Sequence, residues 1–166
     1  MAWLVLGNAA ACELGHDCHE IGCADHVSVR VTARDHPWPE GEYQLEVAFG
    51  ELEGTCEFTL PDELPPRGAV TSIDCVDGVE VGIQQLYECS TQREGDAVSQ
   101  SCQPIPERYE VTLGAYATPE HLSLTLRHNG SLLLDESRDV SYAVTRPNGP
   151  QCEPECRQAT VELSFQ

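Results

Sequence analysis

The sequence predicts an all-β protein in which two antiparallel sheets pack face to face as a β-sandwich. Three observations support this prediction: apolar and polar residues alternate along most of the chain after residue 26, turn-forming dipeptides separate the alternating runs, and the chain contains 9 cysteines. Alternation with a period of two is typical of strands that bury one face and expose the other. A chain of 166 residues is long enough to bury a hydrophobic core.

The first five strands are expected between residues 27 and 83. Their apolar residues recur at every second position: Val27, Val29 and Val31; Tyr43, Leu45, Val47 and Phe49; Cys56, Phe58 and Leu60; Ile73 and Cys75; Val79, Val81 and Ile83. Asp77-Gly78 separates the last two runs, and this dipeptide favours the positive φ of a two-residue hairpin turn. The proline-rich segment 61–68 is a longer connection.

Five more strands are expected between residues 109 and 165. Their apolar positions are Tyr109, Val111 and Leu113; Leu122, Leu124 and Leu126; Leu132 and Leu134; Val140, Tyr142 and Val144; Val161, Leu163 and Phe165. Asn129-Gly130 is a second hairpin signal, and 147–150 is another turn cluster. Many short strands with frequent turns favour an immunoglobulin-like sandwich, with a jelly roll or a barrel as the alternatives.

One sandwich domain is expected over residues 26–166, preceded by a tether over 12–25. A division into two small sandwiches, 26–86 and 108–166, stays open, although units of about 60 residues are marginal without disulfides. The polar segment 87–107 between them contains Cys89 and Cys102. We interpret it as a stapled surface loop.

The N-terminus carries an apolar run that ends in Ala9-Ala10-Ala11-Cys12. This motif resembles the lipobox of bacterial lipoproteins, although Ala9 stands where leucine is usual. Together with the cysteine-containing tail 147–156, it is similar to uncharacterised bacterial lipoproteins. The resemblance implies that residues 1–11 are the remnant of a signal peptide and that Cys12 is lipidated. A plain secretory signal, or a first strand with Cys12 in a disulfide, are the alternatives.

Lipidation of Cys12 leaves an even number of cysteines for disulfides. The candidates are Cys18, Cys23, Cys56, Cys75, Cys89, Cys102, Cys152 and Cys156. Cys56 and Cys75 are in phase with core residues on either side of the 61–68 connection, and Cys89 and Cys102 bracket one loop. The two N-terminal and two C-terminal cysteines pair either locally or with each other. These bonds are expected in a compartment outside the cytoplasm.

A metal site is the alternative use of the N-terminal cluster. His16, His19 and His26 could bind zinc or copper together with nearby cysteines, but the cysteine spacing fits no zinc finger. Asp74, Asp77 and Glu80 bracket one hairpin without the spacing of a calcium loop. A stapled neck with solvated histidines is the preferred interpretation, and no cofactor is expected.

The net charge of −19 excludes the basic footprint of a nucleic-acid-binding protein. All 9 basic residues are arginines, and the motifs of zinc proteases, serine hydrolases and phosphate-binding loops are missing from the sequence. Trp38 lies between two prolines and either binds a sugar or protein partner or caps one end of the sandwich. We therefore expect a non-enzymatic, lipid-anchored module of the bacterial envelope that binds a protein or carbohydrate, or has a structural role.

Overall fold

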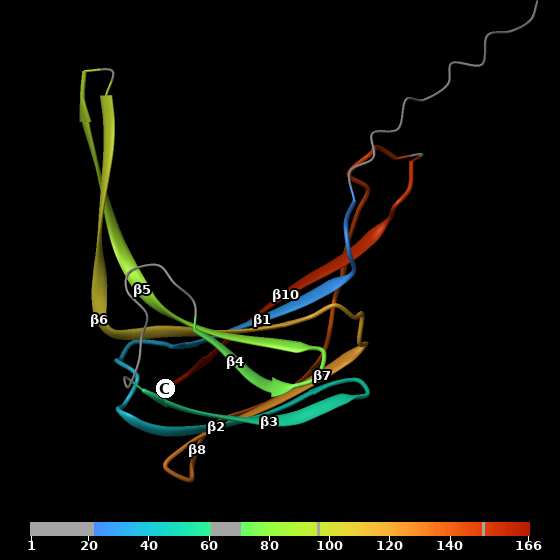
Figure 1. Ribbon diagram of the computed structural model, residues 1–166, viewed down its shortest axis with the longest axis horizontal. Helices are drawn as coiled ribbons and strands as arrows, with labels where there is room; N and C mark the ends of the chain where they lie inside the picture. Colours follow the sequence, from blue (N-terminus) through green and yellow to red (C-terminus); the bar gives the residue numbers. More distant parts are fainter. Residues whose placement is uncertain (1–21, 61–70, 96, 151) are drawn as a thin grey trace, which may run out of the picture.

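The computed structural model describes residues 22–60, 71–95, 97–150 and 152–166. Its strands are β1 (His26–Ala33), β2 (Gly41–Phe49), β3 (Leu52–Leu60), β4 (Thr71–Val76), β5 (Val79–Glu94), β6 (Ala97–Ala115), β7 (His121–His128), β8 (Ser131–Asp139), β9 (Ala143–Thr145) and β10 (Cys156–Phe165). Sheet A has the strand order β4-β5-β6-β1-β10-β9, and sheet B has the order β3-β2-β7-β8. The two sheets lie one above the other, which confirms a sandwich-like all-β fold (Figure 1).

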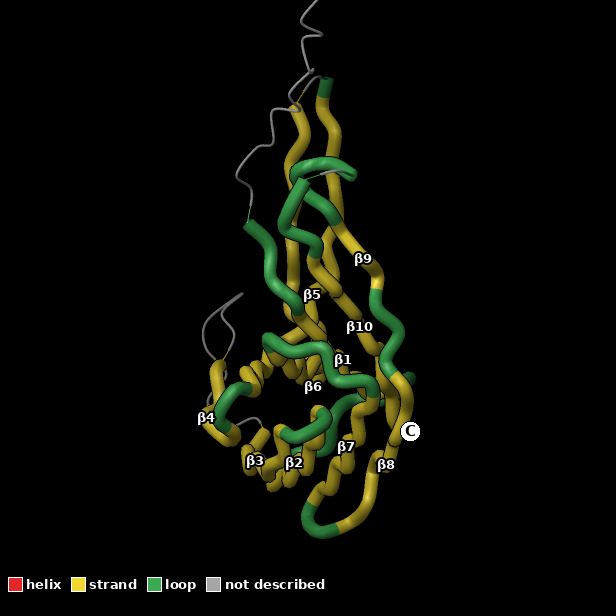
Figure 2. The backbone as a smooth tube through the Cα atoms, turned by 90° about the vertical axis from the view of Figure 1, so that its right-hand side faces the viewer, coloured by secondary structure: helices red, strands yellow, loops and turns green. Residues whose placement is uncertain are grey.

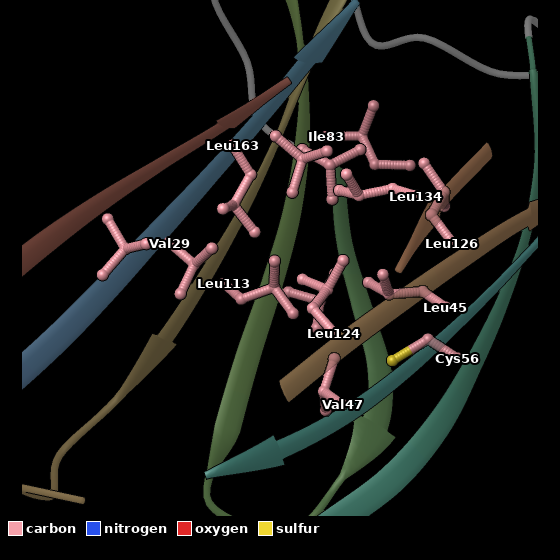
Figure 3. Close-up of a cluster of buried hydrophobic side chains, with 14 of the residues drawn as sticks. Val29, Leu45, Val47, Cys56, Ile83, Leu113, Leu124, Leu126, Leu134 and Leu163 are labelled. Carbon is pink, nitrogen blue, oxygen red and sulfur yellow. The ribbon is translucent and has the colours of Figure 1, made fainter. Parts of the chain in front are cut away.

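The core lies between the two sheets and consists of the alternating apolar residues (Figure 3). Val27, Val29 and Val31 of β1 in sheet A are 0% exposed, and so is Leu45 of β2 in sheet B, which belongs to the same buried cluster. Burying one such side chain stabilises the fold by about 1.5–3 kcal/mol. Strands from both halves of the chain share each sheet and contribute to the same buried cluster.

β1 joins the two ends of the chain within sheet A. It pairs antiparallel with β6, over Val27–Thr32, and parallel with β10, over His26–Ala33. A disulfide joins Cys23 to Cys156 just outside the parallel pair, with 6.1 Å between their Cα atoms. The Asp25 carboxylate accepts a hydrogen bond from the backbone N–H of Arg157 at 2.8 Å. These two contacts fix the register of strands that lie at opposite ends of the sequence.

The segment 87–107, expected to be a loop, is a β-ribbon instead. β5 and β6 continue past the sandwich as a two-stranded projection, in which Tyr87 pairs with Pro104 and Glu94 with Ala97. The ribbon rises well clear of the body (Figure 1). A register shift follows Gln85, and Glu107 has a φ of 56° where the ribbon leaves the sheet. The expectation failed because the residues are polar on both faces, so periodicity carries no strand signal there.

The hairpin between β7 and β8 has the expected turn, since Asn129 and Gly130 have φ values of 47° and 78°. The turn also contacts β2: the Asn129 side-chain oxygen accepts a hydrogen bond from the Glu42 N–H at 3.1 Å. Gly41 beside it has a φ of +141°, and a Cβ there would lie 2.7 Å from His128 Nε2. Glycine is therefore favoured at position 41.

The Gly41→Ala variant is expected to be less stable than the wild type by about 1–3 kcal/mol, because the φ is unfavourable and the Cβ would displace His128 and Asn129. Urea denaturation of the oxidised protein measures this loss. Gly22→Ala is the matched control, since nothing lies within 4 Å of a Cβ at position 22. Equal unfolding free energies for the two variants would contradict the proposed role of Gly41.

Removal of the Cys23–Cys156 disulfide by a double Cys→Ser change is expected to cost about 5 kcal/mol of unfolding free energy, because the bond closes a loop with a sequence separation of 133. The same change at Cys89 and Cys102, whose separation is 13, should affect the ribbon alone. Urea denaturation and amide hydrogen exchange distinguish global from local loss. Equal global losses in both variants would show that the ribbon folds as one unit with the sandwich.

Candidate functional site

The candidate binding surface is the outer face of sheet A, away from sheet B. Two projections stand on this side of the molecule: the β5–β6 ribbon and the end of the sheet formed by β9, β10 and the start of β1 (Figures 1 and 2). Because side chains alternate along each strand, the residues between the buried ones point to this side. The outer face of sheet A is therefore the floor between the two projections.

A groove of about 480 Å³ lies on this floor. It is lined by residues of β1, β4, β5 and β6: His26, Ser28, Ser72, Glu80, Val81, Gly82, Thr112, Leu113 and Gly114. Gly82 pairs with Thr112, and Gly114 pairs with Glu80. A glycine inside a strand leaves the sheet surface without a side chain, so a ligand can approach the backbone there. Gly82 leaves the sheet surface bare in this way, and Gly114 on the neighbouring strand leaves room for the His26 side chain.

Polar side chains surround these glycines. Ser28, Ser72 and Thr112 supply hydroxyl groups, His26 an imidazole and Glu80 a carboxylate. The Thr112 hydroxyl donates a hydrogen bond to the Gly82 carbonyl at 3.4 Å. Hydroxyl and imidazole groups both donate and accept hydrogen bonds, which suits a ligand that is itself rich in donors and acceptors.

An exposed aromatic side chain adjoins the groove. Tyr116 follows β6 and is 68% exposed, one of the few large apolar side chains with this exposure among the described residues. Its ring lies 5.4 Å from the His26 ring, at an interplanar angle of 60°. A Cβ at position 114 would lie 3.0 Å from His26 Nε2, so Gly114 makes the room for the imidazole. The tyrosine offers a flat apolar surface with a polar end.

Charges beside the groove are paired with other side chains. Gln84 donates a hydrogen bond to the Glu110 carboxylate at 2.6 Å, and Arg30 lies 3.5 Å from Glu162. The pKa values of Tyr43 and Tyr109 lie above the ordinary range of tyrosine, mainly because burial disfavours the phenolate. Both of these tyrosines belong to the core and do not line the groove. The groove itself is polar but carries little net charge, because Glu80 is the one carboxylate in its lining.

The outer face of sheet B holds a second cluster, in which His121 lies between Ser137 and Asp139. Its Nε2 is 2.7 Å from the Ser137 hydroxyl and its Nδ1 is 3.0 Å from the Asp139 carboxylate. This is the connectivity of a hydrolase triad. However, the Asp139 side chain is 96% and that of His121 55% exposed, so water screens the interaction. We interpret these contacts as side-chain interactions that help to hold β7 against β8.

Disulfides form at several of the expected cysteines. Cys89 bonds to Cys102 across the ribbon, and Cys23 bonds to Cys156, which is one of the two pairings left open for the chain ends. Cys56 and Cys152 are disulfide-bonded as well. The Cys75 side chain, and Cys12 and Cys18, lie outside the described residues. Disulfides are typical of an oxidising compartment outside the cytoplasm.

The expected metal ligands are only partly described. His16 and His19 lie outside the described residues, and His26 is at the start of β1 beside Tyr116. Within the part of the chain that the structure describes, no three His, Cys, Asp or Glu side chains gather as a metal site would require. Glu80 and Asp77 are exposed near the β4–β5 turn.

Trp38 is part of the core. It is 2% exposed, and its ring packs 4.8 Å from Phe165 and 5.3 Å from Tyr43. The backbone N–H of Trp38 donates a hydrogen bond to the Glu107 carbonyl at 2.8 Å, which holds its loop against the base of the ribbon. Of the two roles that the sequence left open, capping the sandwich is the one that matches this position.

The groove residues Gly82, Gly114 and Tyr116 were not identified from the sequence. The sequence feature that could have indicated the groove is Gly82, a glycine at an outward-facing position between Val81 and Ile83. Comparison of the chain with protein-family models, curated proteins and solved structures gave no match. Over the described residues, no helix has the length and apolar character needed to cross a membrane.

Proposed function

We propose that this chain is a non-enzymatic, lipid-anchored module of the bacterial envelope that binds a neutral glycan in the groove of sheet A. The observation that carries the proposal is the glycine-floored polar groove beside the exposed Tyr116. Its disulfides fit an extracytoplasmic compartment. An immunoglobulin-like connectivity is part of the proposal, and the repeated crossing of the chain between the two sheets supports it.

The chemistry of the groove favours a sugar over other ligands. A sugar ring presents hydroxyl groups at its rim and C–H groups on its faces, so it needs both hydrogen-bonding partners and a flat aromatic surface. Ser28, Ser72 and Thr112 provide the hydroxyls, and Tyr116 provides the aromatic surface. The volume of about 480 Å³ is within the range of small-ligand sites.

The net charge of the protein further restricts the class of ligand that the groove can bind. With a net charge of −19, the chain repels polyanions such as phosphate-bearing polymers. The groove contains one carboxylate, Glu80, and no lysine or arginine. A neutral glycan meets no such repulsion and needs no charged partner. Anchoring through Cys12 would hold the groove close to the glycans of the envelope.

The Tyr116→Ala variant is expected to bind neutral oligosaccharides at least about tenfold more weakly than the wild type, because it loses the aromatic surface. Isothermal titration calorimetry with chitohexaose, cellohexaose and maltohexaose measures the affinity. Leu132→Ala is the matched control, since Leu132 is 53% exposed on β8 of the other sheet. Absence of binding by all three sugars at about 10 mM, or equal affinities of Tyr116→Ala and wild type, would refute the glycan site.

The Cys12→Ser variant is expected to lose membrane association. The test expresses the chain in a Gram-negative host with a lipoprotein leader joined before Ala9, and measures membrane fractionation and the intact mass. The wild type should carry a lipid adduct and sediment with membranes, whereas Cys12→Ser should be soluble; Ala24→Ser is the control. A wild-type protein without lipid would disprove the anchor and leave the groove untouched.

A further inference from the structure

The β5–β6 ribbon has two long edges that no other described strand covers. β4 pairs with β5 only over Val79–Ile83, and β1 pairs with β6 only over Glu110–Ala115. Between Tyr87 and Pro104 the two strands pair only with each other among the described residues. Isolated two-stranded ribbons are marginally stable, and their free edges offer unpaired N–H and C=O groups to another strand.

Three observations show which backbone groups of β6 point to its free edge. The Cα atoms of Cys89 and Cys102 are 4.0 Å apart, the short spacing of a pair without mutual backbone hydrogen bonds. The Ser101 carbonyl faces β5, where the Ser90 hydroxyl donates to it. Pro104 lies two residues after Cys102 and therefore has the same backbone orientation, and its nitrogen has no N–H that would need a partner in β5. The N–H and C=O groups of Val98, Gln100 and Cys102 therefore face outward.

The free edge of β6 carries no charged side chain. Residues 97–106 contain no Asp, Glu, Lys or Arg, in a chain with 22% charged residues and a net charge of −19. Exposed edges are normally protected by charged side chains. This edge lacks such protection, and Val98 on it is 59% exposed.

We propose that the free edge of β6 pairs antiparallel with the same edge of a second copy of this chain. A two-fold axis at Gln100 places Gln100 opposite itself and Val98 opposite Cys102 of the other copy. All three outward-facing residues then meet outward-facing partners, as an antiparallel ladder requires. Pro104 ends the ladder because it has no N–H to donate. Val98 covers the Cys89–Cys102 disulfide of the other copy.

The opposite edge of the ribbon suits such pairing less well. On β5 the outward-facing residues are Cys89, Thr91 and Arg93, by the same alternation. A two-fold axis at Thr91 would place Glu88 opposite Glu94 of the other copy, two like charges directly across the ladder. The charge-free β6 edge is thus the one that accepts a copy of itself.

The length of the ribbon explains how two acidic proteins can meet. Each strand projects roughly 25 Å, at about 3.3 Å per residue. Physiological salt screens charges over about 8 Å. Contact at the ribbons keeps the acidic bodies beyond this distance, and the resulting four-stranded sheet stabilises ribbons that are marginal alone.

Sedimentation velocity of the oxidised protein over concentrations up to about 1 mM tests the pairing. The wild type should form a dimer, and more of it at higher salt, because screening weakens the repulsion between the bodies. Gln100→Pro removes one outward N–H and adds a ring at the edge, so its dimer should be at least about tenfold weaker. Thr91→Pro makes the same change directly across the ribbon on β5 and should dimerise like the wild type.

Circular dichroism and the thermal midpoint establish that both proline variants fold like the wild type. A monomeric wild type at about 1 mM would overturn the proposal. So would a dimer that Gln100→Pro leaves intact, or one that Thr91→Pro weakens equally. Glycan binding is measured separately at Tyr116, so a wild type that binds glycan but stays monomeric refutes this inference alone.

Discussion

Sheet A depends on the position of β1 between β6 and β10. Without β1, the strands β4, β5 and β6 would have no hydrogen-bonded link to β10 and β9. The pairing with β10 joins residues more than a hundred positions apart, so its loop-closure entropy is large. The Cys23–Cys156 disulfide and the Asp25–Arg157 hydrogen bond limit that cost at the point where the parallel pair begins. The valines of β1 then complete the core, so the covalent constraint and the apolar packing reinforce each other.

The ribbon contrasts with the sandwich in what holds it together. Its residues 88–95 and 97–101 are exposed on both faces, so apolar burial contributes little to its stability. Backbone pairing and the Cys89–Cys102 bond maintain it instead. The proposed pairing with a second copy would give this segment a role outside the core. The loop that contains Trp38 fixes the base of the ribbon, because Trp38 donates to Glu107 and Arg108 donates to the His36 carbonyl.

Charge divides the surface into regions with different uses. Carboxylates such as Glu46, Glu57 and Asp135 face outward from sheet B, whereas the groove of sheet A contains one carboxylate and the free edge of β6 contains none. A strongly negative protein stays soluble and resists nonspecific association through self-repulsion. Specific contacts then form where the charge is low. Both proposed contacts, the glycan groove and the ribbon edge, lie in such regions.

The sequence by itself determined most strands of the sandwich, the Asn129-Gly130 turn and the Cys89–Cys102 bond. The strand expected at Val140, Tyr142 and Val144 is instead the short β9, Ala143–Thr145, and Leu132 is exposed because the register of β8 shifts beside it. Alternation such as Val27, Val29 and Val31 reports directly which side of a strand is buried, and positive-φ turns have few suitable residues. Tertiary structure alone decided that β1 pairs with β10, that Trp38 is buried, and that Gly82 and Gly114 lie together beside Tyr116. Period-two patterns are identical for every strand and therefore do not specify partners. The ribbon was not predicted for a related reason. A strand without a buried face has no alternation of apolar and polar residues that would identify it.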